Sequence, residues 1–590
     1  MTLPAALLLA PAAASAHAVL VETVPTRGAT VRAQPDRVVL RFSESVEANF
    51  GALRVFDARA RRADDGPARH PGASGARLAV GLKPGLPDGT YVATYRVISA
   101  DAHPVAGGLV FSIGAPGAAA TATVSDLIGD SSAGPVTQIA LGVARAMTYL
   151  ATALVLGGLL FVLAVWLPAL RTAMGAGQEW AVASQAFLRR TRRLLLGAAA
   201  AGILSGIAGI VLQGATAGAT SAWAALRPSV ARDVLGTRFG EVWGLRVVAF
   251  GALAGVLALA LRGLREPAGA GALPRVALGA DGLAAPGLPR AALPLAAAPA
   301  LVIALAPALA GHAGAQSPAA LLVGLDVAHV LAMSAWVCGL VLVLFALPAA
   351  TRRMPGPDRT RLLAALLRFS PLALGCVVVL LVTGTIQAIE HVGSWDALLS
   401  TGFGRAVVAK VGLIAALIGL GVVNRRRVVP RLRALVARDA APGAAGRLLR
   451  RALRAEVALV VVVIAVTSAL VGMAPPSSSA GGPFSGSAAL GPLRLEATAD
   501  PARVGANEIH LYLLRARDGT PFGGTKELTV TLSLPSRNIG PLSARARAAG
   551  LGHYVVETVQ LVPAGDWRLT VTSRVSEFDQ YEASLKVPVQ

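Results

Sequence analysis

The hydrophobic pattern of the first hundred residues changes with a period of two. Short runs at 38–42, 53–56, 78–80, 91–95 and 109–111 alternate apolar and polar residues, and Gly, Pro or Asp bounds each run. Alternation of this kind is typical of half-buried β-strands. The pattern predicts a small all-β sandwich over residues 17–114. The stretch that follows, 115–137, is rich in Gly, Ala and Thr and is predicted to be a linker.

The middle of the chain has a different pattern, with long apolar runs in place of short alternating ones. Eight segments of about 20 residues are long enough to cross a ~30 Å hydrocarbon core. They lie near 139–167, 194–213, 242–261, 292–311, 321–347, 370–389, 406–424 and 452–473. We therefore expect an eight-helix transmembrane bundle over residues 138–473.

Alternation returns near the C-terminus. Residues 474–488, rich in Pro, Ser and Gly, are predicted to be a second linker, and residues 489–590 a second all-β sandwich. Its expected strands include 509–513, 528–532, 554–556 and 567–571. The predicted fold class is a multi-domain membrane protein, with a β-sandwich on each side of a helical bundle in the sequence.

The first 16 residues have the pattern of a secretory signal peptide. They are apolar and end in Ala14-Ser15-Ala16, a small-x-small cleavage pattern, although the usual basic start is missing. Cleavage there would make His17 the first residue of the mature chain, with a free α-amino group. The alternative is an uncleaved N-terminal anchor, for which the segment is rather short.

The arginines predict the orientation in the membrane. Loops after the first, third, fifth and seventh helices are rich in arginine, including the dense run from Arg425 to Arg454, whereas the loops between them contain few. Because cytoplasmic loops carry the excess of Lys and Arg, both termini are expected to be extracytoplasmic, at a bacterial inner membrane.

Composition excludes several classes of protein. Of 590 residues, 54% are hydrophobic and 15% charged, which excludes a disordered chain and argues against a soluble cytosolic enzyme. The 54 Lys+Arg against 32 Asp+Glu do not indicate nucleic acid, since the arginines lie between apolar runs. Cys338 and Cys376 have no CxxC neighbour, so metal chemistry would need His, Met and carboxylates. No nucleotide-binding motif occurs, which disfavours an ATP-driven pump.

The bundle also contains a sequence repeat. Thr237-Arg238-Phe239-Gly240 is followed by Arg246, and Thr401-Gly402-Phe403-Gly404 is followed by Lys410 at the same spacing. The two copies are separated by an even number of helices, which predicts a parallel repeat.

His17, Asp101 and His103 are the candidate metal ligands of the first domain. A mature N-terminal His offers its amine and its imidazole, and a second imidazole with a carboxylate completes an N,N,N,O set that suits Cu(II). No Met occurs between residues 2 and 146, so the soft ligands of Cu(I) are absent there. A second interpretation stays open, in which His17 is a tolerated terminal residue and Asp101 and His103 form a polar turn.

His329 is the candidate ligand within the bundle. Met333 and Trp336 follow at i+4 and i+7 on the same helical face, and an imidazole beside a thioether is a plausible Cu(I) pair. Asp326, one turn earlier, could orient the imidazole. His312 precedes this helix and His391 ends the next, which sketches a path inward. The alternatives are a packing role for His329 and Met333, and an outward-reaching Lys410.

Several motifs of the first domain resemble the CopC family of periplasmic copper-binding β-sandwiches. They are His17-Ala18, Pro25, Phe42-Ser43-Glu44, Asp88-Gly89-Thr90-Tyr91 and Ser99-Ala100-Asp101-Ala102-His103-Pro104-Val105. The resemblance implies that His17, Asp101 and His103 ligate Cu(II), with Glu44 near the metal.

The segment from Gly311 to Asn424 resembles the CopD family of copper-resistance membrane proteins. The matching motifs are Gly311-His312-Ala313, Asp326-Val327-Ala328-His329, Trp336, Phe369-Ser370, Thr383-Gly384, Phe403-Gly404-Arg405, Lys410 and Asn424-Arg425. The order of parts looks like a CopC–CopD fusion with a YtkA-like β module at the C-terminus. It implies copper movement across the inner membrane, usually inward, with His312 and His329 as ligands.

Copper transport is therefore the first functional hypothesis, and the chain is expected not to be an enzyme. The expected partners are copper ions, the lipid bilayer and periplasmic copper donors or oxidase assembly factors, but no nucleic acid. The alternative is a membrane-anchored copper chaperone or scaffold for cuprous oxidase assembly that translocates nothing. A b-type haem protein is a third reading, although His329 lacks an obvious partner imidazole at matching depth.

Overall fold

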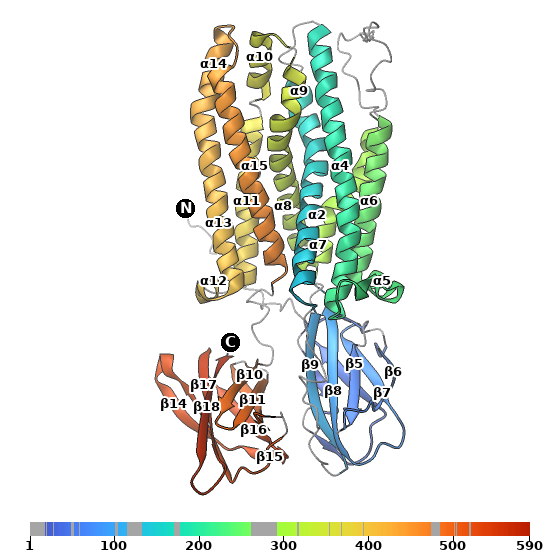
Figure 1. The fold of residues 1–590 in the computed structure, drawn as a ribbon, viewed down its shortest axis with the longest axis vertical. Coiled ribbons are helices and arrows are strands. Elements are labelled where there is room, and N and C mark those ends of the chain that lie inside the picture. The colour runs from blue at the N-terminus through green and yellow to red at the C-terminus, as the bar shows by residue number, and fades with distance from the viewer. Residues whose placement is uncertain are drawn as a thin grey trace, which may run out of the picture. The chain divides into compact units, whose positions relative to one another are not determined.

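The computed structural model divides the chain into a helical unit and a unit that holds the two β parts (Figure 1). It describes residues 18, 20–26, 29–48, 52–57, 59–72, 74–100, 104–114, 133–169, 178–260, 292–314, 318–352, 354–366, 369–392, 395–473, 484–500, 502, 504–517 and 521–589. The helical unit comprises Ala133–Thr216 and Thr220–Pro475. The three-part fold class predicted from the sequence is confirmed.

The N-terminal part is a sandwich of two sheets, with strand orders β1-β3-β7-β6 and β2-β9-β8-β4, and with β5 paired to β8. The strands are β1 (Leu20–Val24), β2 (Thr30–Val31), β3 (Arg37–Phe42), β4 (Val46–Glu47), β5 (Leu53–Asp57), β6 (Asp64–Arg69), β7 (Arg77–Leu82), β8 (Gly89–Ser99) and β9 (Pro104–Ile113). In β3, Val38, Leu40 and Phe42 are buried while the residues between them are not. Alternation thus places one face of each strand in the core, as predicted.

Strand β6 was missed by the sequence pattern because it has no apolar alternation. Its buried Asp64 carboxylate accepts a hydrogen bond from the Val55 N–H at 2.9 Å and forms an ion pair with Arg62. Burial raises the pKa of Asp64, but the hydrogen bonds from Arg62 and Val55 outweigh it and leave the pKa below its usual value. A polar side chain therefore holds this strand in place.

Helices occupy all eight predicted membrane positions. They are α2 (Pro135–Phe161), α4 (Gln178–Ala217), α6 (Arg238–Ala260), α7 (Ala292–Ala310), α8 (Ala319–Val341), α11 (Phe369–Val392), α13 (Gly402–Val423) and α15 (Gly443–Val471). In the described part of the chain, seven apolar helical stretches are long enough to cross a membrane, and the apolar stretch of α7, Pro294–Ala310, is shorter. At 1.5 Å per residue, the 19 residues of α7 still extend about 28 Å.

Several helices run beyond their predicted ends. Helix α4 begins at Gln178 and α15 at Gly443, several residues before the apolar runs that predicted them. Backbone hydrogen bonding continues where the side chains turn polar, so the apolar run marks only the membrane-crossing stretch.

The basic segments gather at one end of the bundle (Figure 1). That end carries three short helices, α9 (Leu347–Thr351), α10 (Gly356–Leu366) and α14 (Val429–Ala437). The other end carries α5 (Pro228–Leu235) and α12 (Trp395–Ser400). This sidedness is what the arginine pattern requires, and the orientation in the membrane stays a prediction.

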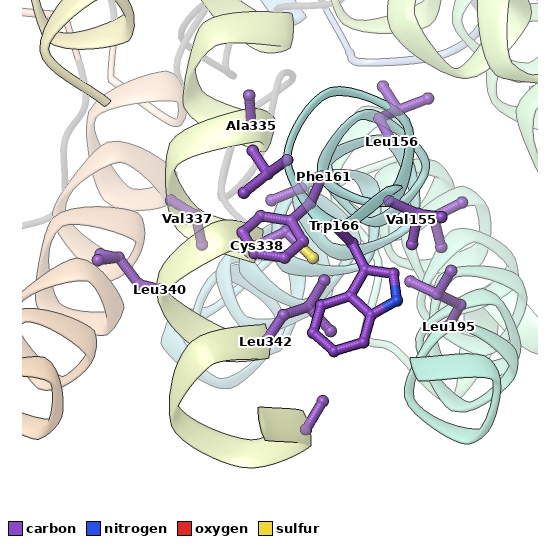
Figure 2. Close-up of a cluster of buried hydrophobic side chains, with 14 of the residues drawn as sticks. Val155, Leu156, Phe161, Trp166, Leu195, Ala335, Val337, Cys338, Leu340 and Leu342 are labelled. Carbon is purple, nitrogen blue, oxygen red and sulfur yellow. The ribbon is translucent and has the colours of Figure 1, made fainter. Parts of the chain in front are cut away.

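Helices α2 and α8 pack closely at the centre of the bundle. A Cβ at Gly157 would lie 1.9 Å from the Ser334 carbonyl oxygen and 2.6 Å from Cys338 Cβ, so only glycine fits there. Figure 2 shows Phe161 and Trp166 from the α2 segment beside Cys338 of α8 in this core. Both cysteines are buried and free, as expected from their spacing.

Three wide π-helical turns interrupt these helices. They are η1 (Val162–Trp166), η5 (Leu342–Ala346) and η6 (Asn424–Val428). Each ends two residues before a proline, namely Pro168, Pro348 or Pro430. A proline has no N–H and its ring collides with the carbonyl four residues earlier, and the wider turn accommodates both effects.

The predicted repeat has a structural counterpart. The Thr237 hydroxyl accepts a hydrogen bond from the Gly240 N–H at 3.1 Å, and the Thr401 hydroxyl accepts one from the Gly404 N–H at 3.0 Å. Each threonine follows a short helix, α5 or α12, and caps a long one, α6 or α13. The same local sequence thus starts the equivalent helix in each half of the bundle.

The C-terminal part is a second sandwich, with strand orders β10-β11-β12-β16-β15 and β14-β13-β17-β18. The strands are β10 (Phe484–Leu490), β11 (Leu493–Asp500), β12 (Gly505–Arg515), β13 (Glu527–Leu534), β14 (Ile539–Ala544), β15 (Arg547–Gly550), β16 (His553–Leu561), β17 (Gly565–Arg574) and β18 (Gln580–Val589). The four predicted strands fall in β12, β13, β16 and β17. Residues 484–488, expected in the linker, belong to β10, because pairing with β11 orders a segment whose small residues alone suggest a loop.

Candidate metal site in the bundle

The helical unit encloses a cavity of about 320 Å³ between α8, α11, α13 and α15. Helix α2 contributes Tyr149 and Thr152, and residues at the end of α7 close one side. Besides Met333, its lining includes the polar residues Tyr149, Thr152, Asp326, His329, Gln387, Glu390, His391, Lys410 and Thr467. Ionisable groups at membrane depth are costly, which makes this cavity a candidate functional site.

A hydrogen bond from a second helix holds the imidazole of His329. Its Nδ1 lies 2.8 Å from the hydroxyl oxygen of Thr383 in α11. That hydroxyl donates its own hydrogen to the Val379 carbonyl oxygen at 2.7 Å, so it accepts from His329. We therefore assign the ring proton to Nδ1, which leaves the Nε2 lone pair for a ligand.

Met333 brings a soft donor to the same wall. It lies one turn after His329 on α8, and both line the cavity together with Trp336. Side chains at i and i+4 are neighbours on a helix, so the thioether can approach an ion held by the imidazole. Imidazole and thioether are a donor pair suited to Cu(I).

Two opposite charges accompany these donors. The Asp326 carboxylate accepts a hydrogen bond from Gln387 Nε2 at 2.8 Å. Lys410 of α13 is close enough to interact electrostatically with both Asp326 and His329. A cation entering the cavity therefore meets a carboxylate as well as two neutral donors.

No group of three His, Cys, Asp or Glu side chains in the described ranges converges with metal-binding geometry. The donors that do meet in the cavity are few and mixed.

Comparisons with protein families match three parts of the chain. The CopC domain matches residues 20–114, the copper resistance protein D-like N-terminal domain matches 136–282, and copper resistance protein D matches 363–470. Helix α8, with His329 and Met333, lies between the last two matches.

Three curated relatives extend this result. The copper transport protein CutJ of Bacillus subtilis is 25% identical over 97% of this chain and 96% of its own length. Protein YobA of Escherichia coli K12 is 33% identical over 17% of this chain and 79% of its own length. Copper resistance protein C of Pseudomonas syringae pv. tomato is 31% identical over 19% of this chain and 93% of its own length.

The chain is a CopC–CopD fusion of the copper-resistance family. The resemblance seen in the sequence is thereby confirmed for these two parts. The likeness of the C-terminal domain to YtkA modules stays a prediction.

The predicted ligands of the CopC domain lie outside the described residues. Strand β8 ends at Ser99 and β9 begins at Pro104, and the structure describes neither Asp101 nor His103. His17 lies outside the described residues too. The Cu(II) set therefore stays a prediction.

The candidates of the CopD-like bundle have different outcomes. His329 and Met333 share the cavity, as their spacing predicts, and His391 and Lys410 line it as well. His312 lies in the short turn η4 (His312–Gly314), and its side chain is not among those described. The hydrogen bond that orients His329 goes to the Thr383 hydroxyl, where the sequence suggested Asp326.

Among three polar residues of α11, sequence reasoning singled out His391, quoted Thr383 only within a family motif and missed Gln387. Thr383, Gln387 and His391 are spaced four residues apart and so lie on one face of an otherwise apolar helix. That polar stripe is the signal that could have identified them.

The C-terminal domain pairs two histidines that lie 43 residues apart in the sequence. His510 Nδ1 lies 3.1 Å from His553 Nε2, across the neighbouring strands β12 and β16, and the Tyr512 ring stacks on His553. Burial, with the neighbouring His510, lowers the pKa of His553 to about 4. The imidazole of His553 is therefore neutral at pH 7.

Proposed function

We propose that this protein binds copper outside the membrane and transports it inward across the bacterial inner membrane. The observation that carries the proposal is the cavity in which His329, with its Nε2 lone pair free, lies on the same helical face as the Met333 thioether. The match of a copper transport protein to 97% of the chain supports it.

The arginine-rich end of the bundle is the cytoplasmic end in this proposal. Basic residues are retained on the cytoplasmic side, so the CopC domain and the C-terminal domain both lie outside. We expect His17, Asp101 and His103 to capture Cu(II) there, through nitrogen and oxygen donors.

The donors of the two sites differ, since nitrogen and oxygen donors suit Cu(II) whereas imidazole and thioether suit Cu(I). We expect copper that enters the bundle as Cu(I) to pass by His312 to His329 and Met333. The Asp326 carboxylate attracts the arriving cation, and Lys410 balances that charge when no ion is present.

Copper uptake by cells tests the proposal. In cells that lack the native protein and grow at limiting copper, His329→Ala should lower cytoplasmic copper to the level of the empty strain, and Met333→Leu should lower it several-fold. Met354→Leu is the matched control, because Met354 is buried in the segment between α9 and α10, away from the cavity. Uptake by His329→Ala equal to wild type would refute the proposal.

The same cells separate transport from a chaperone role. If loss of the protein lowers the copper content of the membrane oxidase while cytoplasmic copper is unchanged, the protein is a scaffold for oxidase assembly. If the protein transports copper, its loss should lower cytoplasmic copper first, and the copper content of the oxidase should fall only afterwards.

A further inference from the structure

A second cavity, of about 180 Å³, lies between the same four helices. Its lining includes Asn424 and Arg425 of η6, Ser370 of α11 and Glu456 of α15. These residues are on the side of the bundle where α14 begins, which is the arginine-rich end. The four helices of the C-terminal half thus enclose two hollows along their length.

The two cavities meet at a partition of three apolar residues. Trp336, Val377 and Leu417 line both of them. Trp336 is 8% exposed and Leu417 is 2% exposed, whereas Val377 is half-buried. The Trp336 side chain is the largest of the three and lines both hollows.

One face of helix α8 lines both cavities and the partition between them. On α8, Asp326, His329 and Met333 line the first cavity, Trp336 lines both, and Leu340 lines the second. The spacing of three or four residues keeps all five on one face of the helix.

Helix α13 shows how far this interior axis extends. Lys410 lines the first cavity and Asn424 the second. Fourteen residues separate them, which is about 21 Å along a helix and most of a ~30 Å hydrocarbon core. The two hollows together therefore reach across much of the membrane.

The second cavity contains a buried acid with an amide partner. Glu456 is 4% exposed, and Asn424 Nδ2 donates a hydrogen bond to its Oε1 at 2.6 Å. The buried Asn424 Oδ1 has no hydrogen-bond partner among the described residues. A carboxylate and a free carbonyl oxygen at the same hollow offer two oxygen ligands to a cation.

We propose that Glu456 and Asn424 form an outlet station for Cu(I), reached from His329 and Met333 past Trp336. This inference rests on the proposed transport function and deepens it. Oxygen ligands hold soft Cu(I) more weakly than imidazole and thioether do. The positive charge of Arg425, in the same lining, weakens binding further, and weak binding at the exit favours release.

Copper exchange by the full-length protein in lipid vesicles tests the outlet station. Vesicles are loaded with Cu(I) under ascorbate, and the entry of isotopically labelled Cu(I) is followed at equal concentrations on both sides. Glu456→Gln should still bind copper at the first cavity but exchange it at least about tenfold more slowly. Glu241→Gln, which alters an exposed carboxylate in the first turn of α6, is the matched control and should exchange normally.

Each outcome has a distinct meaning. Absence of copper exchange in the wild type would refute the proposed transport function itself. Normal exchange in both wild type and Glu456→Gln overturns the outlet station and leaves transport standing.

A third outcome concerns protons. If Glu456→Gln exchanges copper normally but loses net uptake driven by a pH gradient, Glu456 carries protons and the copper station is overturned. Asn424→Ala is the second variant. It should slow exchange as well, and it keeps the test decisive if Glu456→Gln fails to fold.

Discussion

The two halves of the bundle share a repeat but differ in packing. In their most apolar stretches, α4 and α6 have 44% and 33% of residues buried, whereas α13 and α15 have 6% and 17%. Helices α6 and α13 both lie at an edge of the bundle, so exposure to lipid alone does not account for the difference (Figure 1). The two cavities lie mainly among helices of the second half, and Tyr149, Thr152 and Pro307 of the first half complete the lining of the first cavity.

The equivalent positions Arg246 and Lys410 illustrate the same contrast. Arg246 is 1% exposed and its guanidinium lies 4.1 Å above the Trp243 ring. Lys410 lines the cavity instead, near Asp326 and His329. In the proposed function, the copy of the repeat with Lys410 belongs to the copper pathway and the copy with Arg246 to the supporting structure.

Gly157→Val should have the largest effect, a loss of stability, because it disrupts the contact between α2 and α8 that joins the halves. The added side chain would collide with the Ser334 carbonyl oxygen of α8, at a cost of about 3 kcal/mol or more. Thermal unfolding of the purified protein in detergent measures it. Gly419→Ala in α13 is the control, because a Cβ there meets nothing within 4 Å. Similar losses for both variants would contradict the contrast in packing.

Thr383→Val should have the next largest effect, a loss of affinity for Cu(I). It removes the hydrogen bond that holds His329 with its Nε2 free, and loss of such a partner lowers metal affinity by about tenfold or more. Titration of the purified protein with Cu(I) against a competing chelator measures the affinity. Thr467→Val is the matched control, since Thr467 lines the same cavity from α15. Equal affinities for the two variants would remove Thr383 from the site.

Arg246→Met should have the smallest effect on function. The scaffold role predicts copper uptake within about twofold of wild type and a stability change of about 1 kcal/mol, from the lost contact with Trp243. Lys410→Met, at the equivalent position, should instead impair uptake with little change in stability. If Arg246→Met lost uptake as severely as Lys410→Met, the division into scaffold and pathway would be wrong.

The sequence predicted what depends on local pattern. Period-two alternation located β3, β8 and β17, and apolar length located the helices. His329, Met333 and Trp336 were predicted as one face because a single helix sets their spacing.

The missed parts of the site depend on contacts between helices. Thr383 reaches His329 only because α11 packs beside α8, and Glu456 meets Asn424 only because α15 packs beside α13. No local periodicity encodes such pairings. His510 and His553 were overlooked for the same reason, since strand pairing across 43 residues brings them together.

The partition at Trp336 has a consequence for the energy supply of the cell. A continuous column of water through the bundle would let protons flow down their gradient and dissipate the proton-motive force. In the proposed transport, the indole of Trp336 keeps such a column of water from forming. A copper ion that passes from one donor set to the next needs the indole to move only briefly. In the proposed transport function, the residue that separates the two hollows would allow copper uptake without loss of the proton-motive force.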